Sequence, residues 1–288
     1  MGVADRALGQ GVHITLPLVG AQILAELLTH ALGAQPLDVL LIEVVVEQEA
    51  GQLALAGTAI AFVLALLMVF LRIQEPDKRN NDFVKIIKIV ANKFARFYIF
   101  VIRGTPMMVQ SLIFYYAIFN LFKRTGMSVT EINRVWSLFI SGLVTVSLNS
   151  TAYLAEVLRG GILAVDAGQM EAARSLGMTH WQAMRKVVFP QAIKNSLPAI
   201  GNEFIINIKD SSVLCVVGVS DLMFMTRSVA GIYYKGTECY LIAATVYLFL
   251  TYLSSLLLKA ITGRMTAPDN TKRHQGNQTV DLGLPSSN

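Results

Sequence analysis

Charged side chains are scarce in this sequence. Lys, Arg, Asp and Glu together make up 15% of its 288 residues, whereas soluble domains contain about 25%. Hydrophobic residues reach 54%, and the mean hydropathy is +0.54. This composition argues against a disordered chain, a coiled coil and a secreted disulfide scaffold. It predicts an integral membrane protein.

The sequence also has few of the residues that build metal, redox or catalytic sites. Its two cysteines, Cys215 and Cys239, have no C-x-x-C spacing and cannot form a framework of bridges. Its four histidines are scattered, and no His/Glu or nucleophile–base pair lies inside an apolar stretch. We therefore expect no metal, no cofactor and no enzyme activity. The N-terminus lacks the basic stretch, apolar core and cleavage site of a removable signal peptide.

Apolar stretches long enough to cross a bilayer are abundant. A spanning helix needs about 20 largely apolar residues, because its backbone polar groups must be paired within the segment. Four uncharged stretches meet this requirement, at 53–71, 104–122, 135–155 and 239–258. A fifth, 191–208, is more polar and contains Lys194, Asn195, Pro198, Asn202 and Glu203. Since polar residues at membrane depth face a protein interior or a wet cavity, we predict that the fifth span lines a cavity.

Basic residues predict how these spans are oriented. Five spans place the two termini on opposite sides of the membrane. Segments 72–103, 159–194 and 259–288 contain 17 Lys and Arg, and the other three connecting segments contain 7. Because cytoplasmic loops are enriched in Lys and Arg, we expect the N-terminus outside and the C-terminus in the cytoplasm. The same enrichment explains the net charge of +5 without a nucleic-acid partner.

Three segments do not read as simple spans. Residues 83–103 mix basic residues with aromatic and aliphatic ones, which predicts an amphipathic helix at the cytoplasmic membrane surface. Nucleic-acid binding is the weaker alternative for that segment. Residues 1–50 form an atypical external or interfacial segment, ahead of a membrane domain at 51–265, and whether they enter the membrane stays open. The polar tail, 266–288, is expected to be disordered.

The most informative stretch is 167–190, AGQMEAARSLGMTHWQAMRKVVFP. Residues 169–176 are rich in helix formers, and Gly177 stands where a left-handed C-cap ends a helix. A capping box at Thr179 predicts a second helix that ends before Pro190. Spacing alone leaves two interpretations open. The helix-turn-helix either packs as a re-entrant cap on its own bundle or transmits force to a separate soluble subunit.

The residues of this helix-turn-helix match a known pattern. Glu171-Ala172-Ala173 is followed by Gly177 four residues after Ala173, then by nine residues and the word VVFP at 187–190. This long pattern of fixed spacing resembles the EAA loop of binding-protein-dependent ABC transporter permeases. Other short motifs narrow the resemblance, over about residues 53–263, to permeases for polar amino acids (histidine, glutamate, glutamine, arginine, lysine and opines). These motifs are Arg103-Gly104-Thr105-Pro106, Val109-Gln110, Ala155-Glu156, Arg159-Gly160-Gly161, Gln169, Pro190-Gln191-Ala192, Leu197-Pro198-Ala199, Asn202 and Lys209-Asp210-Ser211-Ser212.

The resemblance implies an all-helical permease subunit of an ATP-driven importer in the inner membrane. The chain has no G-x-x-x-x-G-K-S/T motif to bind a triphosphate, so the ATPase is expected on separate subunits, two per complex. An external amino-acid-binding protein and a second permease, identical or paralogous, complete the complex in the lipid. In the family the EAA helix inserts into a groove on the ATPase. The coupling residues expected here are Glu171, Ala172, Ala173, Arg174, Leu176 and Gly177.

The N-terminal part departs from the family pattern. Members usually run from a Gly-x-x-x-Thr-Leu word directly into the first span. Here that word, Gly11 to Leu16, is followed by about 35 residues before the first span begins. An insertion, an extra re-entrant segment and a local irregularity of the sequence all remain open.

Acidic residues of the polar span are the main candidates for substrate binding. Glu203 and Asp210 are seven residues apart, so they share a face of a continuous helix. Carboxylates there suit the ammonium or guanidinium group of a cationic amino acid. Asn149 and Ser150 in the third span are further candidates, although such polar residues also serve as interhelical hydrogen bonds. The alternative is that Glu203 faces water and that Asp210 forms a helix-end ion pair with Lys209.

Other functions are left open by the same residues. The bases expected near the two carboxylates are Lys194 and Lys209, which biases the prediction towards cationic substrates. A permease for neutral or acidic amino acids, such as glutamine or glutamate, is the first alternative. A secondary transporter or a channel subunit is the second, because both use several apolar helices with polar breaks. Neither needs an EAA helix.

Overall fold

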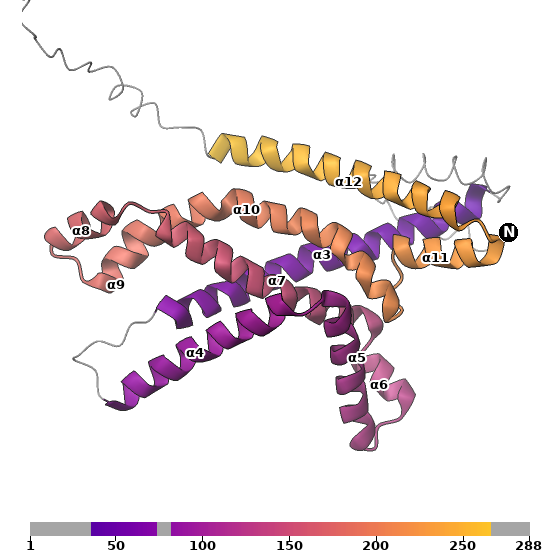
Figure 1. The fold of residues 1–288 in the computed structure, drawn as a ribbon, viewed down its shortest axis with the longest axis horizontal. Helices are drawn as coiled ribbons and strands as arrows, with labels where there is room; N and C mark the ends of the chain where they lie inside the picture. Colours follow the sequence, from indigo (N-terminus) through magenta and orange to yellow (C-terminus); the bar gives the residue numbers. More distant parts are fainter. Residues whose placement is uncertain (1–35, 74–81, 266–288) are drawn as a thin grey trace, which may run out of the picture.

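The structure, a computed structural model, describes residues 36–73 and 82–265 (Figure 1). Over these ranges the chain is helical and contains no β-strand, which confirms the predicted all-α fold class. In chain order the elements are α3 (Pro36–Ile73), α4 (Asp82–Gly104), α5 (Met107–Arg124), α6 (Val129–Val135), α7 (Leu138–Leu163), α8 (Ala167–Ser175), α9 (His180–Ala183), the π-helix η1 (Met184–Val188), α10 (Phe189–Asp210), the 3-10 helix η2 (Ser211–Val216), α11 (Leu222–Tyr233) and α12 (Gly236–Met265). The predictions for residues 1–35 and 266–288 lie outside this description.

Three of the described helices are long and apolar enough to cross a membrane: Gly51–Ile73 within α3, Leu138–Leu163, and Gly236–Gly263 within α12. A fourth span is added if α4 and α5, which meet at an angle of 111°, count as one broken span. The predicted fifth span corresponds to α10, whose polar residues keep it out of this set. Residues 36–50 are helical and continuous with the first span.

Two predicted spans begin at the wrong residue. The second was expected over 104–122, but its helix, α5, starts only at Met107, because Gly104 ends α4 and Thr105 and Pro106 form the break between the two helices. The third was expected over 135–155, but Val135 ends the short α6. Helix α7 starts at Leu138, where the Ser137 side chain accepts a hydrogen bond from the Ile140 N–H and caps the helix.

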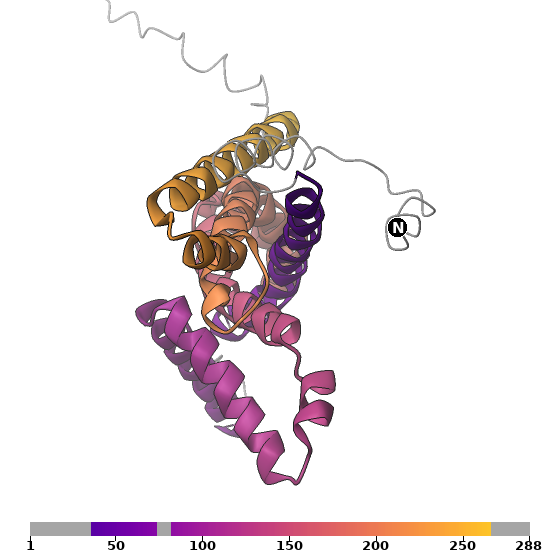
Figure 2. The same ribbon diagram turned by 90° about the vertical axis from the view of Figure 1, so that its right-hand side faces the viewer.

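Helix α7 lies at the centre of the fold and packs against α3, α4, α5 and α10. In Figure 1, α3, α7, α10 and α12 run along the long axis of the molecule, and Figure 2 shows α5 splayed away from them. Small residues let these helices approach closely. A Cβ at Gly57 of α3 would collide with Val146, and one at Gly161 of α7 would overlap the Ser196 side chain of α10. Close contact through small residues is typical of helices packed in membranes.

A polar clasp joins α3, α4 and α7 at one end of the bundle. The Glu156 carboxylate accepts hydrogen bonds from Arg72 of α3 and from Arg159 Nε at 2.9 Å. The Asn92 side chain of α4 donates to the Arg72 carbonyl at 2.9 Å. The partly buried Arg72–Glu156 pair joins α3 to α7, the Arg159–Glu156 pair lies within α7, and the Asn92 hydrogen bond adds α4 to the clasp.

The helix-turn-helix at 167–190 has the predicted caps but not the predicted end. Gly177 has φ +83° and follows α8, and Thr179 forms a complete capping box at the start of α9. Pro190 was expected to stop the second helix, and this was wrong. Helix α9 continues through the π-helix η1 into α10, where Pro190 occupies the first turn. Within this continuous helix Pro190 removes one backbone donor, and the interruption falls directly after the π-helix η1, where the regular α-helical hydrogen-bond pattern is already broken.

Candidate functional site

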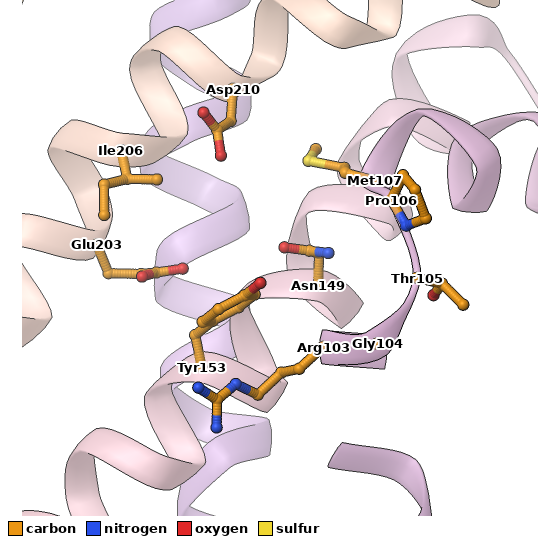
Figure 3. A pocket seen from close by; sticks show the side chains of 10 residues that line it. All are labelled: Arg103, Gly104, Thr105, Pro106, Met107, Asn149, Tyr153, Glu203, Ile206 and Asp210. Carbon is orange, nitrogen blue, oxygen red and sulfur yellow. The ribbon is translucent and has the colours of Figure 1, made fainter. Parts of the chain in front are cut away.

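A cavity of about 530 Å³ lies between the α4–α5 break and the helices α7 and α10 (Figure 3). The break contributes backbone and short side chains, whereas α7 and α10 contribute larger polar groups. The lining residues are Arg103, Gly104, Thr105, Pro106, Met107, Asn149, Tyr153, Glu203, Ile206 and Asp210. Polar groups from three segments far apart in the sequence therefore surround one space.

Helix α10 supplies two carboxylates to the cavity. Glu203, Ile206 and Asp210 are three and four residues apart, so they lie on one face of the helix. The Glu203 side chain is buried, with 7% of the residue exposed. Figure 3 shows its carboxylate directed into the cavity from the same wall as that of Asp210. Glu203 and Asp210 therefore share one face of α10, as their seven-residue spacing predicted, and both line the same cavity.

A base that the sequence analysis did not nominate lies across from these acids. The guanidinium carbon of Arg103, in the last turn of α4, is 5.2 Å from the centre of the Tyr153 ring, a cation–π distance. Neither Lys194 nor Lys209, the bases expected there, lines the cavity. Arg103 is the first residue of the motif Arg103-Gly104-Thr105-Pro106, so the sequence contained a signal that could have nominated it. Only the bend between α4 and α5 places this motif opposite α10.

The structure separates the two adjacent candidates on α7. Asn149 lines the cavity, and its Nδ2 donates to Gln110 Oε1 at 3.0 Å. Ser150 is fully buried and does not line the cavity. Its hydroxyl donates to Asn207 Oδ1 at 2.9 Å, and Asn207 Nδ2 donates to Thr58 Oγ1 at 2.8 Å. Ser150 therefore takes part in a hydrogen-bond chain that joins α3, α7 and α10. This is the interhelical hydrogen bonding that the sequence analysis gave as the alternative to substrate binding.

The predicted coupling residues lie at the tip formed by α8 and α9, remote from the cavity (Figure 1). Glu171, Ala172, Arg174, Leu176 and Gly177 are exposed, and Leu176 is 82% exposed. Ala173 is buried, and α8 packs against α9 and η1. Helix α8 thus presents one face to solvent, including a large apolar side chain at its end.

One aromatic contact ties this tip to the first span. Trp181 of α9 packs edge to face against Phe70 of α3, with ring centres 5.7 Å apart. Across the part of the chain that the structure describes, no group of three or more His, Cys, Asp or Glu residues could hold a metal ion. The site is therefore a polar cavity linked by long helices to an exposed helical tip.

Apolar spanning helices around a polar cavity, with a helical element outside the bundle, define a membrane transport subunit. The chain belongs to the family described as binding-protein-dependent transport system inner membrane component, which residues 87–267 match. The protein is thus a multi-pass inner-membrane permease subunit of an amino acid ABC importer. It is a non-catalytic subunit, and membership of this family implies ATPase and substrate-binding partners.

Named relatives and solved structures agree with this family. The chain is 34% identical over 176 residues to the glutamine transport system permease protein GlnP of Escherichia coli strain K12, covering 61% of this chain and 76% of the relative. It is 30% identical over 210 residues to the nopaline transport system permease protein NocM of Agrobacterium fabrum, covering 72% and 80%. The crystal structure of an amino acid ABC transporter with histidines has a TM-score of 0.61 at 39% identity, covering 75% and 90%. The MetNI methionine ABC transporter, at 17% identity, has the same fold, with a TM-score of 0.62 and coverage of 81% and 99%.

Proposed function

We propose that this permease translocates polar amino acids with a preference for cationic ones, and that the cavity receives the substrate. The observation that carries the proposal is the pair of carboxylates, Glu203 and Asp210, directed into one cavity of about 530 Å³. The Glu203 carboxylate is largely removed from water. A buried carboxylate needs a positively charged or donating partner, and a passing ammonium or guanidinium group supplies one.

The remaining lining groups suit the rest of an amino acid. The Arg103 guanidinium can bind the α-carboxylate in a two-pronged arrangement, and its stacking on Tyr153 holds it at the cavity wall. Met107 and Ile206 provide apolar surface for the methylene groups of a side chain. A cationic amino acid brings two positive groups and one negative group, which matches two carboxylates and one arginine.

The relatives support a polar amino acid as the transported substrate, and the charge of its side chain is the point to test. One relative carries glutamine in its name, another nopaline, and the crystal structure is titled as a transporter with histidines. Import of a neutral amino acid such as glutamine is therefore the second candidate function. The two candidates differ in whether the charge of Glu203 is needed for the side chain or only for the α-ammonium group.

We further propose that α8 couples transport to ATP hydrolysis. Its exposed residues Glu171, Arg174 and Leu176 present charged and apolar groups that a groove on an ATPase can bind. The proposed complex contains two ATPases, a second permease and an external binding protein. The excess of Lys and Arg in 72–103, 159–194 and 259–288 supports a cytoplasmic α8, an external N-terminus and a cytoplasmic C-terminus.

The test compares Glu203→Gln with a matched control, Lys194→Gln, an exposed neutralisation on the same helix outside the cavity. Transport-coupled ATPase activity is measured with the binding protein loaded with L-arginine or L-glutamine. We expect Glu203→Gln to lower the arginine-coupled rate at least tenfold more than the glutamine-coupled rate, and Lys194→Gln to preserve both. Equal losses for the two amino acids in Glu203→Gln would refute the cationic preference and favour a neutral substrate.

A further inference from the structure

The break between α4 and α5 leaves two backbone carbonyls without partners in their own helices. In an α-helix the carbonyl of residue i accepts from the N–H of residue i+4, so Ile102 would pair with Pro106, which has no N–H. The Thr105 carbonyl precedes α5, whose first backbone hydrogen bonds, from Val109 and Gln110, go to the Pro106 carbonyl at 3.0 and 3.1 Å. Unpaired carbonyls are costly inside a membrane protein.

The side chain of Gln110 satisfies both carbonyls. Its Nε2 lies 2.7 Å from the Ile102 carbonyl oxygen, 2.9 Å from the Thr105 carbonyl oxygen and 2.8 Å from Thr105 Oγ1, so its two N–H groups are shared among these three acceptors. Gln110 is buried, with 4% of the residue exposed. Because backbone carbonyls can only accept hydrogen bonds, the NH₂ of the Gln110 amide must face them. Its carbonyl oxygen, Oε1, therefore faces the opposite way.

This orientation decides that of Asn149. Gln110 Oε1 is an acceptor, and Asn149 Nδ2 donates to it at 3.0 Å. An asparagine amide has its NH₂ on one side and its oxygen on the other, so Asn149 Oδ1 is turned away from Gln110. Figure 3 shows this oxygen pointing into the cavity, on the side of Glu203 and Asp210.

We infer that Gln110, which does not line the cavity, is a positioning residue that determines specificity by fixing the amide of Asn149. The cavity then offers an acceptor-only wall, made of Asn149 Oδ1 and the carboxylates of Glu203 and Asp210. Such a wall binds the ammonium or guanidinium group of a cationic amino acid, because these groups only donate hydrogen bonds and every group of the wall accepts them. The inference deepens the proposed function and rests on it, because it assumes that the cavity receives the substrate.

The substitution Gln110→Lys tests the orientation while keeping the break intact. A lysine ammonium can still donate to the carbonyls of Ile102 and Thr105, but it offers Asn149 no acceptor. The Asn149 amide then turns its oxygen to the ammonium and its NH₂ to the cavity. The uptake ratio of L-arginine to L-glutamine should fall about tenfold to a hundredfold, the effect of losing one hydrogen bond to a charged group.

A second substitution should restore the ratio. When Gln110→Lys is combined with Asn149→Asp, the carboxylate accepts from the ammonium with one oxygen and faces the cavity with the other. We expect the ratio to return to within about threefold of the wild type. The matched control is Ser111→Ala, a fully buried neighbour whose hydroxyl donates within α5 to the Met108 carbonyl at 2.8 Å. It should leave the ratio unchanged.

Uptake is measured in proteoliposomes that contain the complete importer, with the binding protein loaded with either amino acid. Each ratio is divided by that of the wild type, so the preference of the binding protein cancels. An unchanged ratio in Gln110→Lys, or a double variant as impaired as the single one, overturns the inference. If Gln110→Lys alone does not assemble, a double variant that assembles with a near-normal ratio supports the inference, and one that does not overturns it. A wild-type importer that takes up neither amino acid refutes the proposed function itself.

Discussion

The turn at Gly177 offers a direct test of coupling through α8. Gly177 has φ +83°, a left-handed conformation, and two hydrogen bonds close the turn: Gly177 N–H to the Arg174 carbonyl at 3.0 Å and Met178 N–H to the Ala173 carbonyl at 3.2 Å. A Cβ at Gly177 would meet no atom within 4 Å. A substitution there consequently perturbs the backbone conformation and no packing contact.

The expected magnitudes follow from that conformation. The left-handed region costs an L-residue about 1–2 kcal/mol, less for Asn and more for a β-branched residue. Gly177→Ala should therefore lower the population of the native turn relative to alternative turns about fivefold to thirtyfold. Gly177→Asn should have a smaller effect and Gly177→Val a larger one. The displaced tip changes the angle at which α8 presents Glu171 and Leu176.

Two measurements check this ranking: the transport-coupled ATPase rate in proteoliposomes, and the amount of ATPase retained when the permease is purified. Both should decrease in the order Gly, Asn, Ala, Val. Gly160→Ala is the matched control, because Gly160 lies inside α7 and a Cβ there also meets no atom within 4 Å. The reasoning is refuted if the three variants at Gly177 couple equally well, or if Gly160→Ala loses as much coupling as they do.

Two further predictions concern stability. Burial raises the pKa of Asp221, between α10 and α11, from 3.8 to about 6, so the folded protein holds a proton that the unfolded chain releases. This stabilisation is present below about pH 4 and is lost as the pH rises through about 6, by up to about 3 kcal/mol. Asp221→Asn, which keeps an N-cap acceptor for the Phe224 N–H, should abolish this pH dependence of thermal unfolding in detergent, and an unchanged profile would contradict the assignment. Gly161→Ala should destabilise the protein by about 1–3 kcal/mol, because the new methyl group overlaps Ser196 Oγ and the Ala192 carbonyl. Ser196→Gly in the same background should recover part of that loss in the melting temperature, and no recovery would place the strain elsewhere.

Local features of the chain were predictable because their causes lie within a few residues. The capping box at Thr179 and the left-handed turn at Gly177 depend on neighbours three to four positions away. The end of the second helix was wrong for the opposite reason. Whether Pro190 stops a helix or occupies its first turn depends on the register of the preceding turn, and η1 shifts that register by one residue.

The sequence by itself determined that the chain is helical, that it spans a membrane and that it carries a helix-turn-helix with the EAA pattern, since hydropathy, capping residues and that pattern are properties of contiguous residues. The cavity was decided by tertiary structure. Arg103 and Glu203 are far apart in the chain, and they share one cavity because α4 and α5 bend by 111° and α10 packs against α7. Asn149 and Ser150 are adjacent, yet one faces the cavity and the other α3 and α10. Neighbouring side chains on a helix point about 100° apart, and only the packing of the surrounding helices decides which of them faces the cavity.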